Sequence, residues 1–268
     1  MSDCSKCGDP LVLEIEADDN DLDVSTASSS SNAVKTVPDD VELSCGCHFH
    51  WQCLLDSYEI AKCPSCGRDV TSTSANEGPQ ILCNLNNEGG LQENLDIMPL
   101  LTEEAYLRAY PEDRKCRAFL EFCREGDLQA VVDLLRSNDD DDDDEEENHE
   151  DEDEEMTDEP SRPKKTADEI LRYQDPIGDM QSGLHAAVSG GSREVAWLLL
   201  LLASNLSELD IPALVYQEAA SLGIMREDQT GKADIRSLRD AHGRSAEQLA
   251  AAAGPVWNGW VGNKRLAI

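Results

Sequence analysis

Apolar residues in the second half of the chain recur at spacings of three and four, a pattern that predicts amphipathic helices. The first helix is expected over residues 102–110, where Thr102 can cap the N-terminus and two glutamates occupy the first turn. Pro111 is expected to begin a second helix, which Gly126 ends before a third one. Helical patterns resume after residue 168 and continue to the C-terminus. The second half is therefore expected to be helical apart from an interruption.

These helices carry a repeat in which small residues are followed by glycine. AVSGG ends at Gly191, AASLG at Gly223 and AAAAG at Gly254, so the pattern returns after 32 and then 31 residues. CREG, which ends at Gly126, indicates an upstream copy. A period of this length is typical of stacked helical repeats.

Polar segments interrupt the apolar patterns in three places. Residues 17–42 are rich in Asp and Ser and predict a flexible insertion. Residues 69–101 contain Gly, Asn, Ser and one short apolar run, ILCNL, so we expect a partly docked linker. A run of acidic residues begins at Asp139, and because dense like charge opposes packing, we expect a disordered insertion over residues 138–167.

The charge of the chain narrows the classes of partner. A formal net charge of -34 should repel the phosphates of nucleic acids and anionic membrane surfaces, whereas basic proteins remain possible partners. The N-terminus shows no secretory signal, and the most apolar run, Val195–Ala203, is too short to span a bilayer. We therefore expect an intracellular protein, cytoplasmic or nuclear. In a reducing compartment, ten cysteines favour metal binding or catalysis over disulfides.

Seven of the ten cysteines lie in the first 66 residues, together with two histidines in the stretch CGCHFHWQC at 45–53. Closely spaced thiols can bend round one ion, with sulfur about 2.3 Å from zinc. Eight ligands arranged as four pairs are enough for two tetrahedral zinc ions. In chain order the pairs are Cys4 and Cys7, Cys45 and Cys47, His50 and Cys53, and Cys63 and Cys66.

This order and spacing resembles the RING finger, a small α+β domain, over residues 4 to about 68. In that family the first and third pairs share one zinc ion, and the second and fourth share the other. The resemblance implies one site of Cys4, Cys7, His50 and Cys53 and another of Cys45, Cys47, Cys63 and Cys66. Further agreements are Phe49 before the histidine, Leu54 after Cys53, and Pro64 inside the last pair.

The RING pattern also chooses between Cys47 and His48 as the fourth ligand. With His48 only one residue, Phe49, would separate the fourth and fifth ligands, and the pattern requires two or three. We therefore expect Cys47 to be the ligand and His48 to face solvent or support the site.

Two other cysteine-rich frameworks remain as alternatives. A disulfide scaffold is disfavoured by the expected intracellular location. A PHD finger uses the same mixture of ligands, but it spaces the fourth and fifth ligands more widely. It also has an aromatic residue two places before the seventh ligand, where this chain has Ala61.

The RING resemblance implies a ubiquitin ligase that has no catalytic nucleophile. Such a domain docks a ubiquitin-conjugating enzyme and orients the attached ubiquitin, so its contribution is positioning. The residues expected on the docking surface are Lys6, Leu54, Pro64 and Arg68. The match is uneven, because Lys6 stands where an apolar residue is usual and Arg68 comes one place late. A zinc-stabilised docking module without ligase activity is the alternative.

Residues 175–202 resemble an ankyrin repeat, with matches that include Ser182, Leu184, His185 and Gly191. The segment 243–254 resembles a variant of the same repeat, AASLG a degenerate copy, and REGDLQAVVDLL the second half of another. The resemblance implies that His185 caps turns and that the array binds a protein. A generic helical bundle is the alternative. Trp257 and Trp260 are expected to cap the array or to form a contact patch.

The prediction is thus a multidomain chain with two functional hypotheses. In the first, a RING-type ubiquitin ligase selects its substrate through the ankyrin-like face. In the second, a non-enzymatic escort protein uses its acidic tract to attract a basic client, although that tract could also be a solvated spacer. The predicted parts are a zinc-stabilised RING domain at 1–68, a linker at 69–101, first ankyrin-like helices at 102–137, the acidic insertion at 138–167 and an all-α ankyrin-like solenoid at 168–268.

Overall fold

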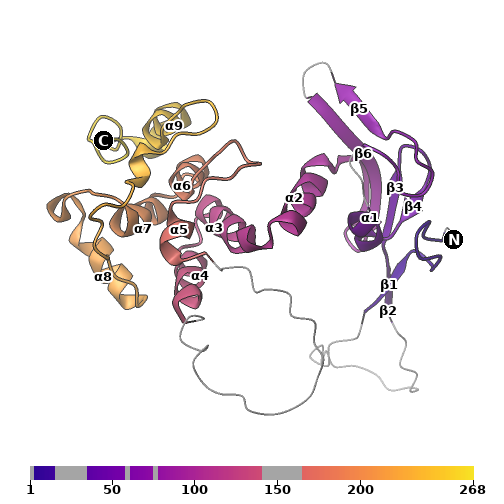
Figure 1. The fold of residues 1–268 in the computed structure, drawn as a ribbon, viewed down its shortest axis with the longest axis horizontal. Coiled ribbons are helices and arrows are strands. Elements are labelled where there is room, and N and C mark those ends of the chain that lie inside the picture. The colour runs from indigo at the N-terminus through magenta and orange to yellow at the C-terminus, as the bar shows by residue number, and fades with distance from the viewer. Residues whose placement is uncertain (1–2, 16–34, 58–60, 75–77, 141–164) are drawn as a thin grey trace, which may run out of the picture. The chain divides into compact units, whose positions relative to one another are not determined.

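A computed structural model describes residues 3–15, 35–57, 61–74, 78–140 and 165–268. The chain forms two compact units, Met1–Tyr106 and Leu107–Ile268 (Figure 1). The first is a mixed α+β unit and the second is helical. No helix among the described residues is both long enough and apolar enough to cross a membrane.

Antiparallel strands form most of the N-terminal unit (Figure 1). Strands β1 (Val12–Ile15) and β2 (Lys35–Pro38) pair with each other as a separate ribbon. A curled five-stranded sheet has the order β4-β3-β6-β5, and β7 also pairs with β6. The bounds of its strands are Asp40–Leu43 for β3, His48–Phe49 for β4, Thr71–Ser74 for β5, Gly78–Asn87 for β6 and Gly90–Asp96 for β7.

The core of this unit follows the alternation of the strands. In β3, Val41 and Leu43 are buried while their neighbours are half-buried, and in β6 Ile81 and Cys83 repeat the pattern. Alternate residues of a strand point to opposite faces, so both strands present one apolar face to the core. The short helix α1 (Trp51–Ser57) follows β4 and adds the buried Leu54 to this core.

The structure differs from the sequence prediction in two polar segments. Residues 35–43, mostly inside the predicted flexible insertion at 17–42, form β2 and β3, whereas residues 16–34 lie outside the described part of the chain. The predicted linker at 69–101 holds β5, β6, β7 and the start of a helix. The pairing of β3 with β6 and the burial of alternate residues in these strands outweigh the polar composition of the two segments.

Helix α2 (Met98–Ala109) begins four residues before Thr102, the predicted cap. The carboxylate of Asp96 accepts the Met98 N–H at 3.1 Å, and the Thr102 hydroxyl donates to the Met98 carbonyl at 2.8 Å. Thr102 therefore lies inside the helix and does not cap it.

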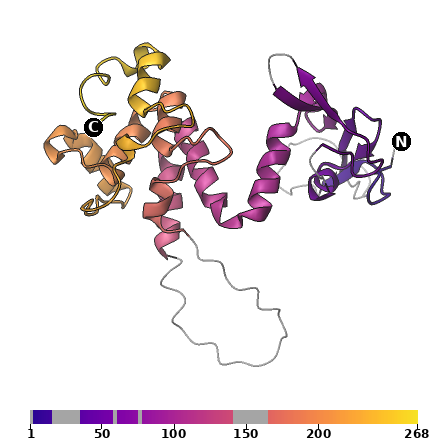
Figure 2. The ribbon, with the colours of Figure 1, turned by 45° about the horizontal axis from the view of Figure 1, so that its top comes forward.

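Seven further α-helices form the described part of the C-terminal unit (Figures 1 and 2). As predicted, Gly126 ends the helix that follows Pro111, in the left-handed conformation with φ of 81°. The bounds are Arg114–Glu125 for α3, Leu128–Asp140 for α4, Ala167–Leu171 for α5, Gly183–Gly190 for α6, Arg193–Ala203 for α7, Ala213–Ser221 for α8 and Ala246–Ala253 for α9.

Helix α6 packs between α3 and α9, so the three helices form a row (Figure 1). A Cβ atom at Gly183 would lie 2.6 Å from the Phe119 ring, and one at Gly190 would lie 1.8 Å from the carbonyl oxygen of Arg124. These two glycines therefore let α3 and α6 approach closely.

The glycine-ended repeat is only partly a structural repeat. Gly126, Gly191 and Gly254 follow α3, α6 and α9, the three helices of the row. Helix α8, which carries AASLG, packs against α7 instead. The copy predicted at AASLG is therefore an insertion between α7 and α9, and its spacing of about 32 residues does not reflect the stacking.

Buried tryptophans close one end of the helical core. The indole N–H of Trp257 donates to the carbonyl of Val188 at 3.1 Å, and the ring centroids of Trp197 and Trp260 lie 4.6 Å apart. Both Trp257 and Trp260 are buried in the core cluster. Of the two roles predicted for them, the burial supports capping over a contact patch.

The acidic insertion predicted at 138–167 is structured at its edges. Helix α4 extends to Asp140, Lys165 forms an ion pair with Asp113, and Thr166 caps α5 in a reciprocal arrangement with Glu169. Residues 141–164, which include most of the acidic run, lie outside the described residues.

Candidate metal centre

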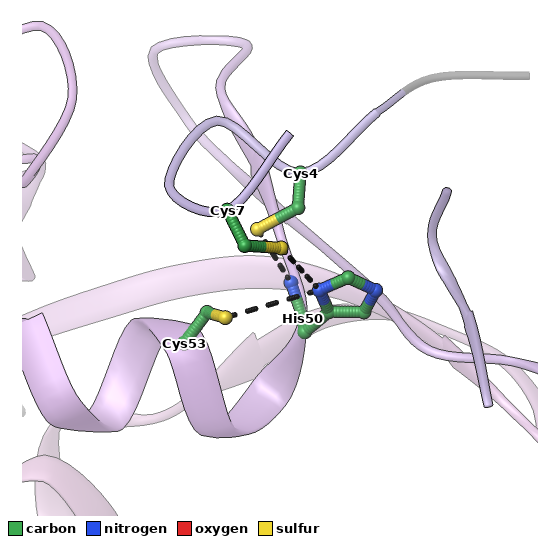
Figure 3. A group of neighbouring side chains, drawn as sticks. All are labelled: Cys4, Cys7, His50 and Cys53. Atoms are coloured by element: carbon green, nitrogen blue, oxygen red, sulfur yellow. Dashed lines mark hydrogen bonds between the residues drawn. The ribbon is translucent and has the colours of Figure 1, made fainter. Parts of the chain in front are cut away.

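The first predicted group of ligands comes together in the N-terminal unit. The ligand atoms of Cys4, Cys7, His50 and Cys53 all lie within 4.8 Å of one another (Figure 3). The Nδ1 atom of His50 is 3.4 Å from Cys7 Sγ and 3.9 Å from Cys53 Sγ. Tetrahedral zinc with bonds of about 2.0–2.3 Å separates its ligand atoms by roughly 3.5–3.8 Å. The group therefore has the dimensions of one zinc site.

A second contact orients the ring of His50 for metal binding. Its Nε2 atom lies 2.9 Å from the carbonyl oxygen of Pro10. Because a carbonyl only accepts, Nε2 carries the proton and Nδ1 keeps its lone pair, which faces the three thiols. The ring is thus held in the tautomer that a metal requires.

The second predicted group is composed of thiols alone. The sulfur atoms of Cys45, Cys47, Cys63 and Cys66 also lie within 4.8 Å of one another. Thiolate-rich sites of four ligands favour zinc. Each group could therefore hold one metal ion, and zinc fits the ligand chemistry of both.

The first and last ligand pairs are each held by a backbone turn, and the two turns have the same hydrogen bonds. In the first, the Cys4 N–H donates to Asp9 O at 2.8 Å and the Gly8 N–H donates to Cys4 O at 2.9 Å. Gly8 has φ of 80°, a conformation that other residues adopt only at a cost. The last pair repeats both bonds, with Cys63 N donating to Arg68 O and Gly67 N to Cys63 O, and Gly67 has φ of 70°. A glycine directly after each Cys-x2-Cys pair was a sequence signal that the prediction did not use.

The two inner pairs are separated by the short strand β4. Cys45 and Cys47 lie in the turn before it, where the Leu43 N–H donates to Cys47 O at 3.0 Å and Gly46 has φ of 81°. His50 follows β4 directly. Cys45 and Cys47 therefore join the group of four thiols, and the next pair, His50 and Cys53, joins the group that contains the histidine.

His48 lies outside both groups, as expected. It pairs with Glu42 in the ladder between β3 and β4, and its Nδ1 atom lies 2.8 Å from the carboxylate of Asp40. The next residue, Phe49, points to the opposite face and is fully buried. The strand thus turns His48 toward Asp40 and away from the thiols.

Helix α1 fixes the third pair. Asp39 Oδ1 accepts the Trp51 N–H at 3.1 Å, and the Leu54 N–H donates to His50 O at 3.0 Å. Cys53 lies three positions after His50, so both ligands lie on the same side of the first turn. Asp39 falls in the segment predicted to be a flexible insertion, and its supporting role was missed for that reason.

One thiol in each group has a lowered pKa. Burial acts to raise the pKa of Cys4, but backbone N–H groups, that of Cys7 foremost, donate hydrogen bonds to its sulfur and lower the pKa to about 6. A backbone hydrogen bond at Arg68 lowers the pKa of Cys66 to about 7. Each group therefore offers one thiolate near neutral pH.

The neighbouring thiols are harder to ionise. Burial, together with the adjacent sulfur atoms, raises the pKa of Cys47 and of Cys53 to about 12. Several thiolates cannot share a small volume unless a cation compensates their charge. The convergence of four donors in each group therefore matches a divalent metal better than four free thiols.

The remaining three cysteines belong to apolar cores. Cys83, Cys116 and Cys123 are buried and unoxidised, and burial raises the pKa of Cys83 to about 11 and of Cys116 to about 12. Within the described part of the chain, the two groups above are the clusters suited to a metal.

The predicted docking residues do not share one environment. Lys6 and Arg68 are exposed, and Pro64 is half-buried in the turn of the last pair. Leu54 is 0% exposed and packs in the core of the unit. Because it is fully buried, Leu54 belongs to the core and does not reach a docking surface.

His185 has a structural environment that suits the capping role expected for it. Its Nδ1 atom lies 2.8 Å from the Ser182 hydroxyl, and its Nε2 atom lies 3.1 Å from the carbonyl oxygen of Arg244. The ring therefore links the start of α6 to the segment that precedes α9.

Comparison with known proteins finds no matching family model, no matching curated protein and no matching solved structure.

Proposed function

We propose that the N-terminal unit is a RING-type zinc domain and that the chain acts as a ubiquitin ligase by docking a ubiquitin-conjugating enzyme. The observation that carries this proposal is the interleaving of the ligand pairs: the first joins the third, and the second joins the fourth. Ligand pairs that merely bind zinc could instead be grouped in chain order. Interleaving makes two ions hold one small unit, and it is the arrangement that the RING resemblance implies.

The activity of such a domain comes from positioning. No nucleophile is required, because holding the conjugating enzyme and its ubiquitin in a reactive geometry lowers the entropic part of the barrier. Pro64 and Arg68 are the residues of this chain that we assign to the contact, since both reach the surface beside the last ligand pair. Lys6 is exposed on the turn of the first ligand pair and provides a charged contact at the edge of the docking surface.

We assign substrate binding to the helical unit, as an ankyrin-like array. Support comes from two successive helix pairs, α3 with α4 and α6 with α7, each joined by a short turn that contains glycine. The first helices of these pairs stack as a row with α9. Such arrays bind proteins on their concave face and rarely catalyse reactions. A tethered substrate would be presented to the docked enzyme at high effective concentration.

An autoubiquitination assay with a panel of conjugating enzymes tests the proposal. The unaltered chain should form ubiquitin chains with at least one enzyme, and Cys63→Ser should abolish them. Pro64→Ala should reduce the rate about tenfold or more, whereas Ser65→Ala in the same turn should not. Arg68→Ala should also reduce the rate, and Lys62→Ala serves as its control because both side chains are basic and exposed.

Zinc content must remain at two equivalents in these four surface variants, so that a loss of rate reports docking and not unfolding. The absence of ubiquitin chains with every enzyme of the panel would refute the ligase and leave a zinc-stabilised interaction module.

A further inference from the structure

An open groove lies in the N-terminal unit, and its described lining contains none of the cysteines of the two metal groups. Its walls are the β1–β2 ribbon, the start of α1 and the end of β6 with the turn that follows it. The groove has a volume of about 760 Å³. Pockets that enclose small ligands have volumes of roughly 300–1,000 Å³. It is therefore large enough for a few side chains of a bound segment and too small for a folded domain.

The floor of the groove is apolar. Leu13 of β1 is 51% exposed, and it stands beside Val37 and Pro38 of β2. Trp51 and Leu85, both half-buried, complete the floor from α1 and β6. Covering such a surface with another apolar group is favourable because it removes apolar area from water. The floor therefore offers apolar surface that the side chains of a bound segment can cover.

The rim of the groove is acidic. The charged residues among its described lining are Glu14, Asp39 and Glu88, and this lining contains no basic residue. Asp39 already accepts the Trp51 N–H, whereas Glu14 of β1 and Glu88 in the turn after β6 are exposed. Exposed carboxylates next to an apolar floor favour a ligand that combines positive charge with apolar surface.

We propose that this groove binds a short segment of a partner protein in which one or two large apolar side chains are flanked by lysine or arginine. The apolar side chains cover Leu13 and Trp51, and the flanking cations face Glu14 and Glu88. A second copy of this chain is a poor occupant because its net charge of -34 would face the same acidic rim. The inference concerns the groove alone and does not depend on ligase activity.

Peptide binding to the full-length, zinc-loaded chain tests the groove. The probe is a fluorescein-labelled eight-residue peptide with two central leucines and three lysines on each side. Binding is measured by fluorescence anisotropy at near-physiological salt, where long-range attraction to an acidic chain is screened beyond about 8 Å. The comparison peptides replace the lysines by glutamates or the two leucines by serines. Only the original peptide should bind, with at least a tenfold advantage over both others.

Matched variants locate the binding site. Leu13→Ser should weaken binding about fivefold or more, since it removes apolar contact at the floor, whereas Leu91→Ser should not. Leu91 is 62% exposed on β7 and lies outside the groove lining. The double change of Glu14→Lys with Glu88→Lys should weaken binding at least tenfold. The double change of Glu93→Lys with Glu125→Lys alters the net charge equally at exposed sites elsewhere.

Several outcomes would overturn the inference. Equal effects of the two leucine variants, or of the two charge reversals, would mean that the peptide binds the acidic surface of the chain in general. Equal binding of the serine peptide would show that the apolar floor is not used. Equal binding of the glutamate peptide would show that the acidic rim is not used.

Discussion

Replacing Cys47 or His48, one at a time, tests the assignment of the ligands most directly. Both residues are possible ligands by chemistry, and they are adjacent in the chain. The structure places the Cys47 sulfur within 4.8 Å of three other thiols and directs the ring of His48 to Asp40. Cys47→Ser should therefore cost one metal ion, and His48→Ala should cost none.

The two effects differ in size. Structural zinc in small peptides is worth about 10–16 kcal/mol, so one ligand in four accounts for roughly 3–4 kcal/mol, or about 100- to 1,000-fold in affinity. His48→Ala removes one hydrogen bond, whose net contribution is about 0.5–1.5 kcal/mol. The side chains of His48 and Asp40 are 27% and 26% exposed, so we expect the lower part of that range.

Metal content after dialysis against a chelator of moderate affinity is the measurement. Unaltered chain and His48→Ala should retain two equivalents of zinc, and Cys47→Ser should retain about one. Cobalt substitution adds a second readout, because the group made of four thiolates and the group with one imidazole have different visible spectra. The double variant, Cys47→Ser with His48→Ala, shows whether His48 replaces the missing thiolate. If it does, Cys47→Ser alone would keep two ions and the double variant would lose one. Loss of an ion from His48→Ala with full retention in Cys47→Ser would refute the assignment.

Three other predictions concern stability. Gly190→Ala should lower the free energy of unfolding of the helical unit by about 3 kcal/mol, because the added Cβ would lie 1.8 Å from Arg124 O and helices α3 and α6 must separate. Urea denaturation measures this change. Ser189→Ala, at an exposed position of the same helix, is the control and should be nearly neutral. A chelator at pH 5 should remove zinc, since protons compete for the thiolates. Residues 1–106 should then become sensitive to protease while the helical circular dichroism signal persists. Equal protection from protease with and without metal would contradict the structural role of zinc. Burial lowers the pKa of His185, so the unfolded chain binds more protons at this residue and stability should be lost as pH falls below about 6.5. An unchanged free energy of unfolding between pH 7.5 and 5 would contradict the burial of a neutral ring.

The metal ligands were predictable because each pair is a local feature. Two cysteines separated by two residues approach one ion whatever the rest of the fold does, and the order of the pairs then implied their grouping through the RING resemblance. The supporting contacts were not predictable in this way. Pro10 O and Asp39 are distant from their partners along the chain, and only the folded sheet brings them to His50 and Trp51.

The errors in secondary structure have a common physical cause. Residues 35–43 contain two Asp, and residues 78–87 contain three Asn after Gly78 and Pro79, so local composition indicates a loop. Their strands are stabilised by long-range pairing of β3 with β6, which a local pattern does not contain. The spacing of AASLG was misleading for a similar reason, because regular spacing along the chain does not show which helices touch.

The first metal group and the acidic-rimmed groove share a structural element, so the groove should depend on zinc. Trp51, in the groove floor, directly follows the ligand His50, and Asp39 in the rim holds the start of the helix that carries Cys53. Removing the ion would free that helix and the first ligand pair, which leads into β1. We expect chelation to weaken binding of the lysine–leucine peptide at least tenfold, and added zinc to restore it. The Cys47→Ser variant separates the two metal groups, because it empties the group that has no ligand in this helix. Peptide binding that survives complete removal of both ions would show that the ribbon and α1 form the groove without zinc.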